Sequence, residues 1–279
     1  MASRVGFVGL GNIGRPMARN VLRGGFALTV FDLDPEPGRQ LAAEGARVAA
    51  SLAELGPECD PIGVCVRDDA EVEEVLFGLL GAVRPGTIVA IHSTIRPRTV
   101  VRLAETAAAR GVHVLDVPVT GGAHGAEART LCCMAGGDAQ LVERCRAVFE
   151  TSASTIVPTG PLGSGMKTKL CTNLMTYLGF VAVSEAVRLA EAAGLPRETV
   201  QAVTQANGVL TRSMLAYLDM REDVRARGAD EAVRQQLARF ADLAEKDLAI
   251  TLEVADELGV PLPAAALCRM LMARVYDLE

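Results

Sequence analysis

A lysine and an asparagine four residues apart, Lys169 and Asn173, form the pair of side chains in this sequence best suited to acid–base chemistry. They follow Gly163-Ser164-Gly165 and open a run without charge that extends to Ser184. On a helix, this spacing places both side chains on one face. The positive end of the helix dipole and desolvation both favour the neutral amine of a lysine near a helix start, which allows proton exchange near neutral pH. The pair therefore predicts a catalytic lysine with a polar companion, against the alternative of a lysine that extends into solvent beside a helix-start asparagine.

The segment that carries this pair is expected to form one long helix over residues 163–194. Leu170 and Tyr177 belong to an apolar series at helical spacing, so we expect this helix to be buried on most sides. Its length exceeds that of an ordinary globular helix, as is usual where a helix joins two parts of a chain. Lys167 is the rival candidate for the reactive lysine, but its neighbour four residues on is Cys171, which leaves it without a polar companion.

A second constellation lies at the start of the chain, where a glycine-rich turn separates a predicted strand from a predicted helix. The turn consists of Gly9, Leu10, Gly11, Asn12, Ile13 and Gly14. In a strand–turn–helix unit, the first glycine makes the turn, the second admits the pyrophosphate and the third packs helix on strand. The helix N-terminus then faces the phosphates. Asp32, eighteen residues after Gly14 at the end of the next strand, can accept hydrogen bonds from ribose hydroxyls. This pattern predicts a dinucleotide site, against the alternative of a glycine turn with no ligand.

The rest of the chain divides into an alternating and a helical part. Strand and helix patterns alternate over residues 1–162, which predicts a doubly wound and mostly parallel Rossmann-like sheet. Ligands bind such sheets beyond the carboxyl ends of the strands, and Ser93-Thr94 and Thr120-Gly121-Gly122 follow two of those ends. Only helical patterns occur over residues 163–279. We therefore expect an α/β cofactor-binding domain followed by an all-helical domain for substrate binding and oligomerisation.

Composition excludes several classes of function. The chain has 279 residues, enough for two domains, and its net charge of −6 argues against a nucleic-acid partner. The longest apolar run is too short and too polar to predict a membrane span, and no signal peptide is expected. Seven cysteines without C-x-x-C pairs indicate reduced thiols and a cytoplasmic protein. Three scattered histidines give no metal-binding spacing, so no metal is expected.

Four motifs in register resemble one family over nearly the whole chain. They are the glycine-rich segment from Gly9, Asp116-Val-Pro-Val-Thr-Gly-Gly, Gly163-x-Gly-x-x-x-Lys169-x-x-x-Asn173 and Lys246-Asp247-Leu248. Together they are similar to the β-hydroxyacid dehydrogenases, the group that includes 3-hydroxyisobutyrate dehydrogenase and tartronate semialdehyde reductase. The resemblance implies a Rossmann-like domain, an all-helical domain, an active site between them, and a homodimer or homotetramer formed through the helical domain.

By position, the resemblance assigns Lys169 as the catalytic lysine and Asn173 as its companion in substrate binding. It places the substrate carboxylate on Thr120, Gly121 and Gly122, where the family more often has Ser than Thr. This is chemically reasonable, because one hydroxyl and consecutive backbone N–H groups can hold a carboxylate without a full positive charge.

The resemblance also assigns two residues near the cofactor and exposes two departures. Thr94 corresponds to a residue beside the nicotinamide, and Lys246 to one that reaches both cofactor and substrate; the alternative for Lys246 is an ordinary surface lysine. Val66 and Arg67 stand where the family usually has a hydrophobic residue and Pro over the cofactor. Arg129 replaces a usual Gly before Thr130-Leu131, which puts the substrate loop in question.

These features predict an NAD(P)-dependent oxidoreductase that transfers a hydride from a small 3-hydroxy carboxylate, similar to 3-hydroxyisobutyrate, with Lys169 as general acid–base. Asp32 faces the position of a 2′-phosphate, and Leu33-Asp34 adds a second carboxylate, so NAD is expected to be preferred and NADP is the alternative. Three other functions remain open. They are a semialdehyde reductase acting on tartronate or succinic semialdehyde, an imine reductase of the same fold, and a non-catalytic dinucleotide-binding module.

Overall fold

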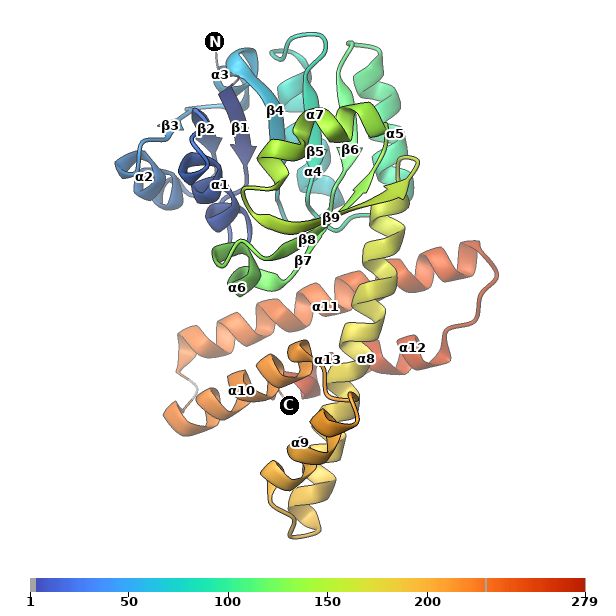
Figure 1. Ribbon diagram of the computed structural model, residues 1–279. Helices are drawn as coiled ribbons and strands as arrows, with labels where there is room; N and C mark the ends of the chain where they lie inside the picture. The colour runs from blue at the N-terminus through green and yellow to red at the C-terminus, as the bar shows by residue number, and fades with distance from the viewer. Residues whose placement is uncertain (1–3, 229, 279) are drawn as a thin grey trace. The chain divides into compact units, whose positions relative to one another are not determined.

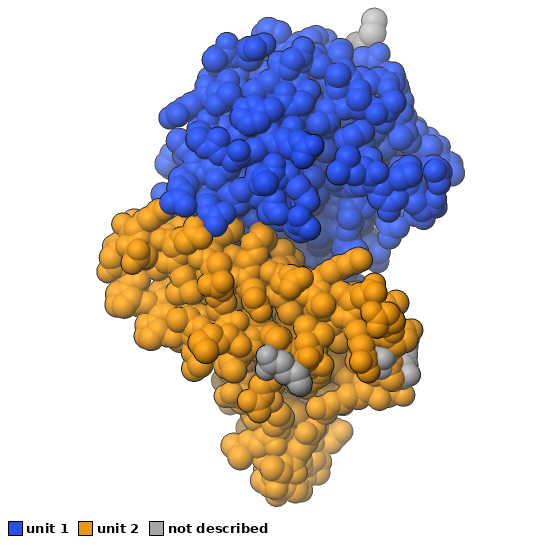
Figure 2. Space-filling view, turned by 180° about the vertical axis from the view of Figure 1, so that it is seen from behind, with its two compact units in different colours: residues 1–169 blue, residues 170–279 orange. Residues whose placement is uncertain are grey.

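The structure is a computed structural model that describes residues 4–228 and 230–278. The chain forms two compact units, residues 1–169 and residues 170–279, which Figure 2 shows in different colours. The division falls inside helix α8 (Ser164–Ala192), shortly after the expected boundary between residues 162 and 163.

The first unit is built on one nine-stranded sheet (Figure 1). Its order begins β3 (Arg47–Val48), β2 (Leu28–Phe31), β1 (Arg4–Val8), β4 (Cys59–Val64), β5 (Ile88–Ile91) and β6 (His113–Asp116). Every neighbouring pair in this series is parallel. The edge beyond β6 consists of β8 (Leu131–Gly136), β7 (Val119–Thr120) and β9 (Ala153–Gly160). There β8 is antiparallel to β6 and β7 and parallel to β9. The predicted mostly parallel, doubly wound sheet is confirmed.

Helices cover both faces of this sheet. They are α1 (Gly14–Arg23), α2 (Pro35–Ala43), α3 (Leu52–Leu55), α4 (Asp69–Leu80), α5 (Pro97–Ala108), α6 (Gly122–Glu127) and α7 (Ala139–Phe149), with a 3₁₀ turn at Gly56–Glu58. Because successive strand side chains point to opposite faces, Phe7 joins one core and Val8 the other. The Phe7 core includes residues of α1, α6 and α7, and the Val8 core includes residues of α4 and α5. In Figure 1, α7 lies in front of the strands and α4 behind them.

Three of these helices begin at an aspartate whose carboxylate accepts a backbone N–H of the first turn. Asp34 caps α2, Asp68 caps α4 and Asp138 caps α7. Such caps satisfy amides that have no acceptor within the helix. The caps therefore fix where each helix starts, just after the strand that precedes it.

The second unit contains only helices within residues 170–228 and 230–278. They are the rest of α8, α9 (Arg197–Ala206), α10 (Arg212–Arg227), α11 (Glu231–Glu257), α12 (Pro263–Met270) and α13 (Met272–Val275). Tyr177, Tyr217, Leu248 and Met272 lie in its core. The all-helical character expected after residue 162 is confirmed. α10 extends to Arg227, and a turn at Leu271 separates α12 from α13.

Helix α8 is less buried than its apolar sequence predicts. Leu170 and Tyr177 are buried, but Met175 is 67% exposed and Leu189 is 72% exposed. Contrary to the expectation from its sequence, α8 passes a test of length and apolar composition for a membrane span, with 28% of its most apolar window buried. One such helix is weak evidence, because the core helix of a water-soluble protein passes the same test. The prediction that α8 is buried on most sides is wrong for the single chain.

Candidate functional site

The glycine-rich turn has the backbone shape that a dinucleotide site requires. Gly9 has a φ of 88°, and a Cβ there would meet the carbonyl of Cys65. A Cβ at Gly14 would meet the carbonyl of Gly9, so the third glycine allows α1 to pack closely on the turn. A Cβ at Gly11 would meet no described atom within 4 Å. The middle glycine thus leaves open the space where a pyrophosphate would approach the backbone, and the turn fits the cofactor.

Asp32 connects this turn to the end of β2. Its Oδ2 accepts the N–H of Leu10 at 2.5 Å, and its Oδ1 accepts the N–H of Asp34 at 2.8 Å. The second bond is a local cap of the turn that follows β2. The first holds the carboxylate against the glycine-rich turn. Because each carboxylate oxygen has two acceptor sites, Asp32 keeps the capacity to accept ribose hydroxyls.

The loops after β4 and β5 are joined by side-chain hydrogen bonds. The N–H of Val66 donates to Ser93 Oγ at 2.8 Å. Asp69 Oδ1 accepts the N–H of Arg96 at 3.1 Å and the hydroxyl of Thr99 at 2.6 Å. These bonds hold together the carboxyl ends of two neighbouring strands. Thr94, half-buried, follows Ser93 in the second loop.

Arg67, the first departure from the family pattern, lies on the surface with its side chain 74% exposed. Its guanidinium forms ion pairs with Asp68 at 3.1 Å and Glu71 at 3.2 Å. Its backbone N–H also donates to Glu71 Oε2 at 2.8 Å. The arginine is therefore held against the acidic first turn of α4.

The proposed substrate segment forms the short strand β7 and the start of α6. Thr120 pairs in register with Cys132 of β8. Gly121 and Gly122 have φ angles of 127° and 65°, and a Cβ at Gly122 would meet no described atom within 4 Å. Positive φ at both positions favours glycine over any residue with a side chain. Two successive glycine amides next to a hydroxyl give the set of donors that a carboxylate requires.

Arg129, the second departure, adopts the backbone conformation that the usual glycine would. Its φ is 60°, in the left-handed region. Its Nε donates to the carbonyl of Thr151 at 2.8 Å. The substrate loop is therefore closed with glycine-like geometry although the residue is an arginine.

Lys169 interacts electrostatically with Cys132, the strand partner of Thr120. Burial raises the pKa of the Cys132 thiol, and the positive charge of Lys169 partly opposes that shift. The ammonium is thus within electrostatic range of Cys132, whose backbone pairs with Thr120. Lys169 is half-buried, whereas the rival Lys167 is exposed. Within the first unit, the structure therefore brings the candidate acid–base group close to the candidate carboxylate segment.

In the second unit, Asn173 belongs to a buried polar cluster that the sequence did not reveal. Asp247 Oδ2 accepts Asn173 Nδ2–H at 2.7 Å and the hydroxyl of Tyr177 at 3.1 Å. Lys246 Nζ lies 2.9 Å from Asp247 Oδ1, as an ion pair rather than a well-aligned hydrogen bond. The side chain of Lys246 is 20% exposed, so it is not an ordinary surface lysine. The feature that could have indicated a role for Asp247 is the presence of a carboxylate among the buried positions of α11, such as Leu248.

In the described part of the chain, the histidines, cysteines and acidic residues provide neither a metal site nor a reactive thiol among the buried cysteines. Among residues 4–228 and 230–278, no group of three or more His, Cys, Asp or Glu side chains is arranged to hold a metal. All seven cysteines are free thiols. Burial raises the pKa values of Cys65, Cys133 and Cys145 to about 12, so these thiols are poor nucleophiles.

Comparison with known proteins places the chain among the hydroxyacid dehydrogenases. Residues 4–160 match the model of the NAD binding domain of 6-phosphogluconate dehydrogenase. Residues 163–277 match the model of the NAD-binding domain of NADP-dependent 3-hydroxyisobutyrate dehydrogenase.

Individual relatives match over nearly the whole chain. An uncharacterized oxidoreductase of Mycobacterium tuberculosis is 37% identical over 97% of this chain and 92% of its own length. A probable mitochondrial 3-hydroxyisobutyrate dehydrogenase of Dictyostelium discoideum is 33% identical over 92% and 81%, respectively. The structure of Mycobacterium tuberculosis 3-hydroxyisobutyrate dehydrogenase with L-serine is 27% identical, has a TM-score of 0.83 and covers 99% of this chain and 94% of that one.

The fold and the glycine-rich turn define the protein as a nicotinamide-dinucleotide-dependent oxidoreductase. The chain belongs to the β-hydroxyacid dehydrogenase family, and its activity is that of an NAD(P)-dependent 3-hydroxyacid dehydrogenase.

Proposed function

We propose that this protein oxidises a small 3-hydroxy carboxylate with NAD, and that Lys169 is the general acid–base. The observation that carries the proposal is the proximity of Lys169 to Cys132, the strand partner of Thr120. This proximity supports the idea that one small molecule can contact both the proton-transfer group and the carboxylate site. A relative named for 3-hydroxyisobutyrate and a structural relative solved with L-serine point to the same substrate class, since both compounds carry a hydroxyl on C3.

Oxidation of the alcohol to a carbonyl removes one hydride and one proton. A bound nicotinamide supplies the hydride acceptor, and Gly9, Gly11, Gly14 and Asp32 are the residues that would hold its dinucleotide. Lys169 accepts the hydroxyl proton as a neutral amine, and in the reverse direction it donates that proton as an ammonium. General acid–base catalysis of this kind contributes about 10²- to 10⁴-fold to the rate.

Asn173 has an orientation that suits it to assist Lys169. A carboxylate can only accept hydrogen bonds, so the amide N–H₂ of Asn173 must be the group that faces Asp247. The amide oxygen of Asn173 is then directed elsewhere and can accept from the Lys169 ammonium, one helical turn earlier, or from the substrate hydroxyl. Asp247 in this way sets which end of the amide serves the reaction.

The substrate carboxylate is assigned to Thr120, Gly121 and Gly122. The hydroxyl of Thr120 and the glycine amides supply donors, and because Gly121 and Gly122 have no side chain, no Cβ stands beside those amides. Lys246 is assigned a second contact with substrate and cofactor, with Asp247 holding its ammonium in place. Hydrogen bonds to a charged acceptor are about twice as strong as neutral ones, so this set of donors can anchor a small acid.

The test of the acid–base role compares two lysines of the same helix. Lys169→Ala should fold and bind NAD, but its kcat should fall by about 10²- to 10⁴-fold. Lys167→Ala, two residues away and exposed, should keep wild-type kcat. Activity is measured as NAD and NADP reduction against 3-hydroxyisobutyrate, glycerate, threonate and serine. Near-wild-type turnover by Lys169→Ala would show that the proton carrier is another group.

Three other functions compete with this one, and the same assay separates them. A semialdehyde reductase working on tartronate or succinic semialdehyde would use the same residues but favour the reductive direction. An imine reductase of this fold would reduce cyclic imines and have no need of a carboxylate segment such as Thr120–Gly122. A non-catalytic dinucleotide-binding module would bind the cofactor without turnover of any hydroxy acid or imine. The presence of both Lys169 and the donors at Thr120–Gly122 favours the hydroxy-acid activity.

The domain roles, the oligomeric state and the location of the protein are part of the same proposal. We assign cofactor binding to residues 1–162, and substrate binding and oligomerisation to residues 163–279. The exposed apolar side chains of the second unit support a homodimer or homotetramer; they include Met175, Leu189, Val203 and Met270. Free thiols support a cytoplasmic location. A monomer mass by light scattering would contradict the oligomer.

A further inference from the structure

Asp116, at the end of β6, is a fully buried carboxylate to which the catalytic scheme gives no role. Its Oδ1 accepts the N–H of Gly163 at 2.9 Å, and its Oδ2 accepts the N–H of Met166 at 2.8 Å. Both amides belong to the turn that opens α8, where backbone N–H groups have no acceptor within the helix. The carboxylate comes from a strand about fifty residues earlier in the chain, so these bonds join a strand to a helix rather than cap a helix locally.

The glycines around Asp116 make this close approach possible. A Cβ at Gly136, the register partner of Asp116, would touch the carboxylate and the backbone N of Gly165. A Cβ at Gly165 would touch the carbonyls of Met134 and Asp116. Gly163 has a φ of 86°, which favours glycine. The Gly163-Ser164-Gly165 sequence therefore serves to seat the first turn of α8 against the ends of β6 and β8.

A buried carboxylate at the end of β6 destabilises the fold unless its interactions offset the loss of hydration. Burial raises the pKa of Asp116, while the N–H groups of Gly163, Met166 and Gly165 act in the opposite direction. Removal of a charge from water is unfavourable, and well-packed apolar residues often stabilise a protein as well or better. The hydrogen bonds to the start of α8 are what an apolar residue could not supply.

Asp116 lies between the two parts of the proposed reaction site in the first unit. Lys169 follows Met166 by less than one helical turn, and Thr120 follows Asp116 by four residues. We propose that Asp116 is a positioning residue that fixes Lys169 relative to the carboxylate segment at Thr120–Gly122. This inference rests on the proposed role of Lys169. A displacement of about 1 Å in such a group can reduce the rate by about 10²-fold.

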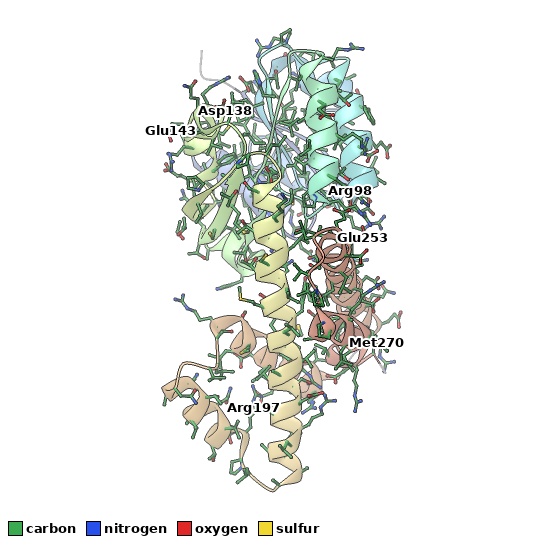
Figure 3. All side chains as sticks on the ribbon, turned by 90° about the vertical axis from the view of Figure 1, so that its right-hand side faces the viewer. Arg98, Asp138, Glu143, Arg197, Glu253 and Met270 are labelled. Carbon is green, nitrogen blue, oxygen red and sulfur yellow. The ribbon has the colours of Figure 1, made fainter. Side chains whose placement is uncertain are left out.

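The first test measures hydrogen exchange and does not depend on activity. In the wild type, the amides of Gly163 and Met166 should exchange slowly, although a helix start offers them no acceptor within the helix. Asp116→Asn should speed their exchange at least tenfold, because an amide side chain accepts one of the two N–H groups and opposes the other. Asp138→Asn is the matched control. Asp138, labelled in Figure 3, accepts two amides at the start of α7, and α7 carries no proposed site residue. Asp138→Asn should leave exchange of the Gly163 and Met166 amides unchanged.

The second test is a comparison of kcat with KM. Asp116→Asn should lower kcat about 10- to 100-fold and leave KM for NAD within about twofold. The KM for NAD should hold because β4 and β5 separate β6 from the strand that carries the glycine-rich turn. Asp138→Asn should keep the wild-type kcat, which excludes a general effect of losing a helix cap.

The exchange and kinetic results together test whether Asp116 positions Lys169. Wild-type exchange of the Gly163 and Met166 amides in Asp116→Asn overturns the proposal, and so does faster exchange with an unchanged kcat. If Asp116→Asn does not fold, unprotected exchange of these amides in the wild type overturns it, and protection supports it. A wild type that turns over none of the hydroxy acids overturns the function proposed for Lys169, and with it the catalytic purpose of Asp116. The exchange result would then still establish whether Asp116 holds the helix start.

Discussion

At the scale of single residues, the sequence revealed side chains whose role depends on local spacing. The glycine-rich turn and Asp32 could be recognised because their partners lie within a few residues or in the next strand. Asp116 and Asp247 could not be assigned a role, since their partners lie about fifty to seventy residues away and only the fold brings them together. Sequence reasoning finds reactive types of residue, but not the buried residues that orient them.

Asp32 carries the prediction on cofactor choice. Both of its oxygens already accept backbone N–H groups, so the carboxylate is held where a 2′-phosphate would meet its charge. Like charges about 4 Å apart repel by about 1 kcal/mol in water and by several in a drier site. Arg39, a cation near this strand end, forms an ion pair with Glu36 at 3.0 Å. We expect kcat/KM to favour NAD over NADP by at least tenfold.

An Asp32→Asn, Leu33→Arg double variant should reduce or reverse that preference, because Leu33 is 86% exposed and an arginine there can reach a phosphate. The measurement is kcat/KM with each cofactor at a fixed hydroxy-acid concentration. Equal use of NAD and NADP by the wild type would contradict the role given to Asp32.

Arg129 gives a prediction on stability. An L-residue other than glycine costs about 1 kcal/mol in the left-handed region, and the hydrogen bond to Thr151 offsets about the same amount. Arg129→Ala keeps the backbone cost and loses the hydrogen bond, so it should destabilise the protein by about 1 kcal/mol. Arg129→Gly loses both and should be close to wild type. Urea unfolding compares the two variants, and equal stability would show that the backbone at this position is unstrained.

At the scale of helices and strands, long periodic elements were predictable and short ones were not. The all-helical character of residues 163–279 could be predicted, because many residues contribute to the pattern of a long helix such as α11. The sequence missed β7 and α6, which have too few residues for a period to be visible, although they carry Thr120–Gly122. It also could not give the antiparallel direction of β8, since an apolar run has the same appearance in either direction. The least regular part of the sheet is therefore the part that carries the proposed substrate segment.

Arg221 links three elements of the second unit. Its guanidinium, only 9% exposed, pairs with Asp277 through two bonds and donates to Ser184 of α8 at 3.0 Å. Asp277→Ala would leave a nearly buried cation with fewer partners. The expected loss is about 1–3 kcal/mol, between the values for exposed and for buried pairs, because Arg221 is nearly buried whereas Asp277 is 43% exposed.

Arg225→Ala is the control for this prediction. Arg225 lies one turn further along α10 and pairs with Glu191 at 3.4 Å, with both side chains about half exposed. Its loss should change stability by less than about 0.5 kcal/mol. Similar losses for Asp277→Ala and Arg225→Ala, measured by thermal unfolding, would show that the Arg221 cluster does not hold the end of the chain.

At the scale of the whole molecule, His92 links stability to pH. Burial lowers its pKa to about 4, its ring stacks on Phe7, and its Nδ1 lies 2.8 Å from the carbonyl oxygen of Val117, within hydrogen-bond distance. The folded ring must be the donor, because a carbonyl only accepts. Its unfolded pKa is about 6.5. Between pH 6.5 and about 4, His92 is therefore protonated in the unfolded chain but neutral in the folded chain. Stability attributable to His92 is therefore full above pH 6.5 and falls by up to a few kcal/mol as the pH drops to about 4.

His92→Gln removes this titration and keeps a donor for Val117. The variant should be less stable than the wild type at pH 7, because it loses the stacked ring, but its stability should fall less between pH 6.5 and pH 4.5. Asp116 acts in the opposite direction, since its raised pKa favours the folded state as the pH drops, but it is present in both proteins and cancels in the difference. Denaturant unfolding at several pH values measures the two curves. Parallel curves would mean that His92 is not the buried group that couples folding of this enzyme to acid.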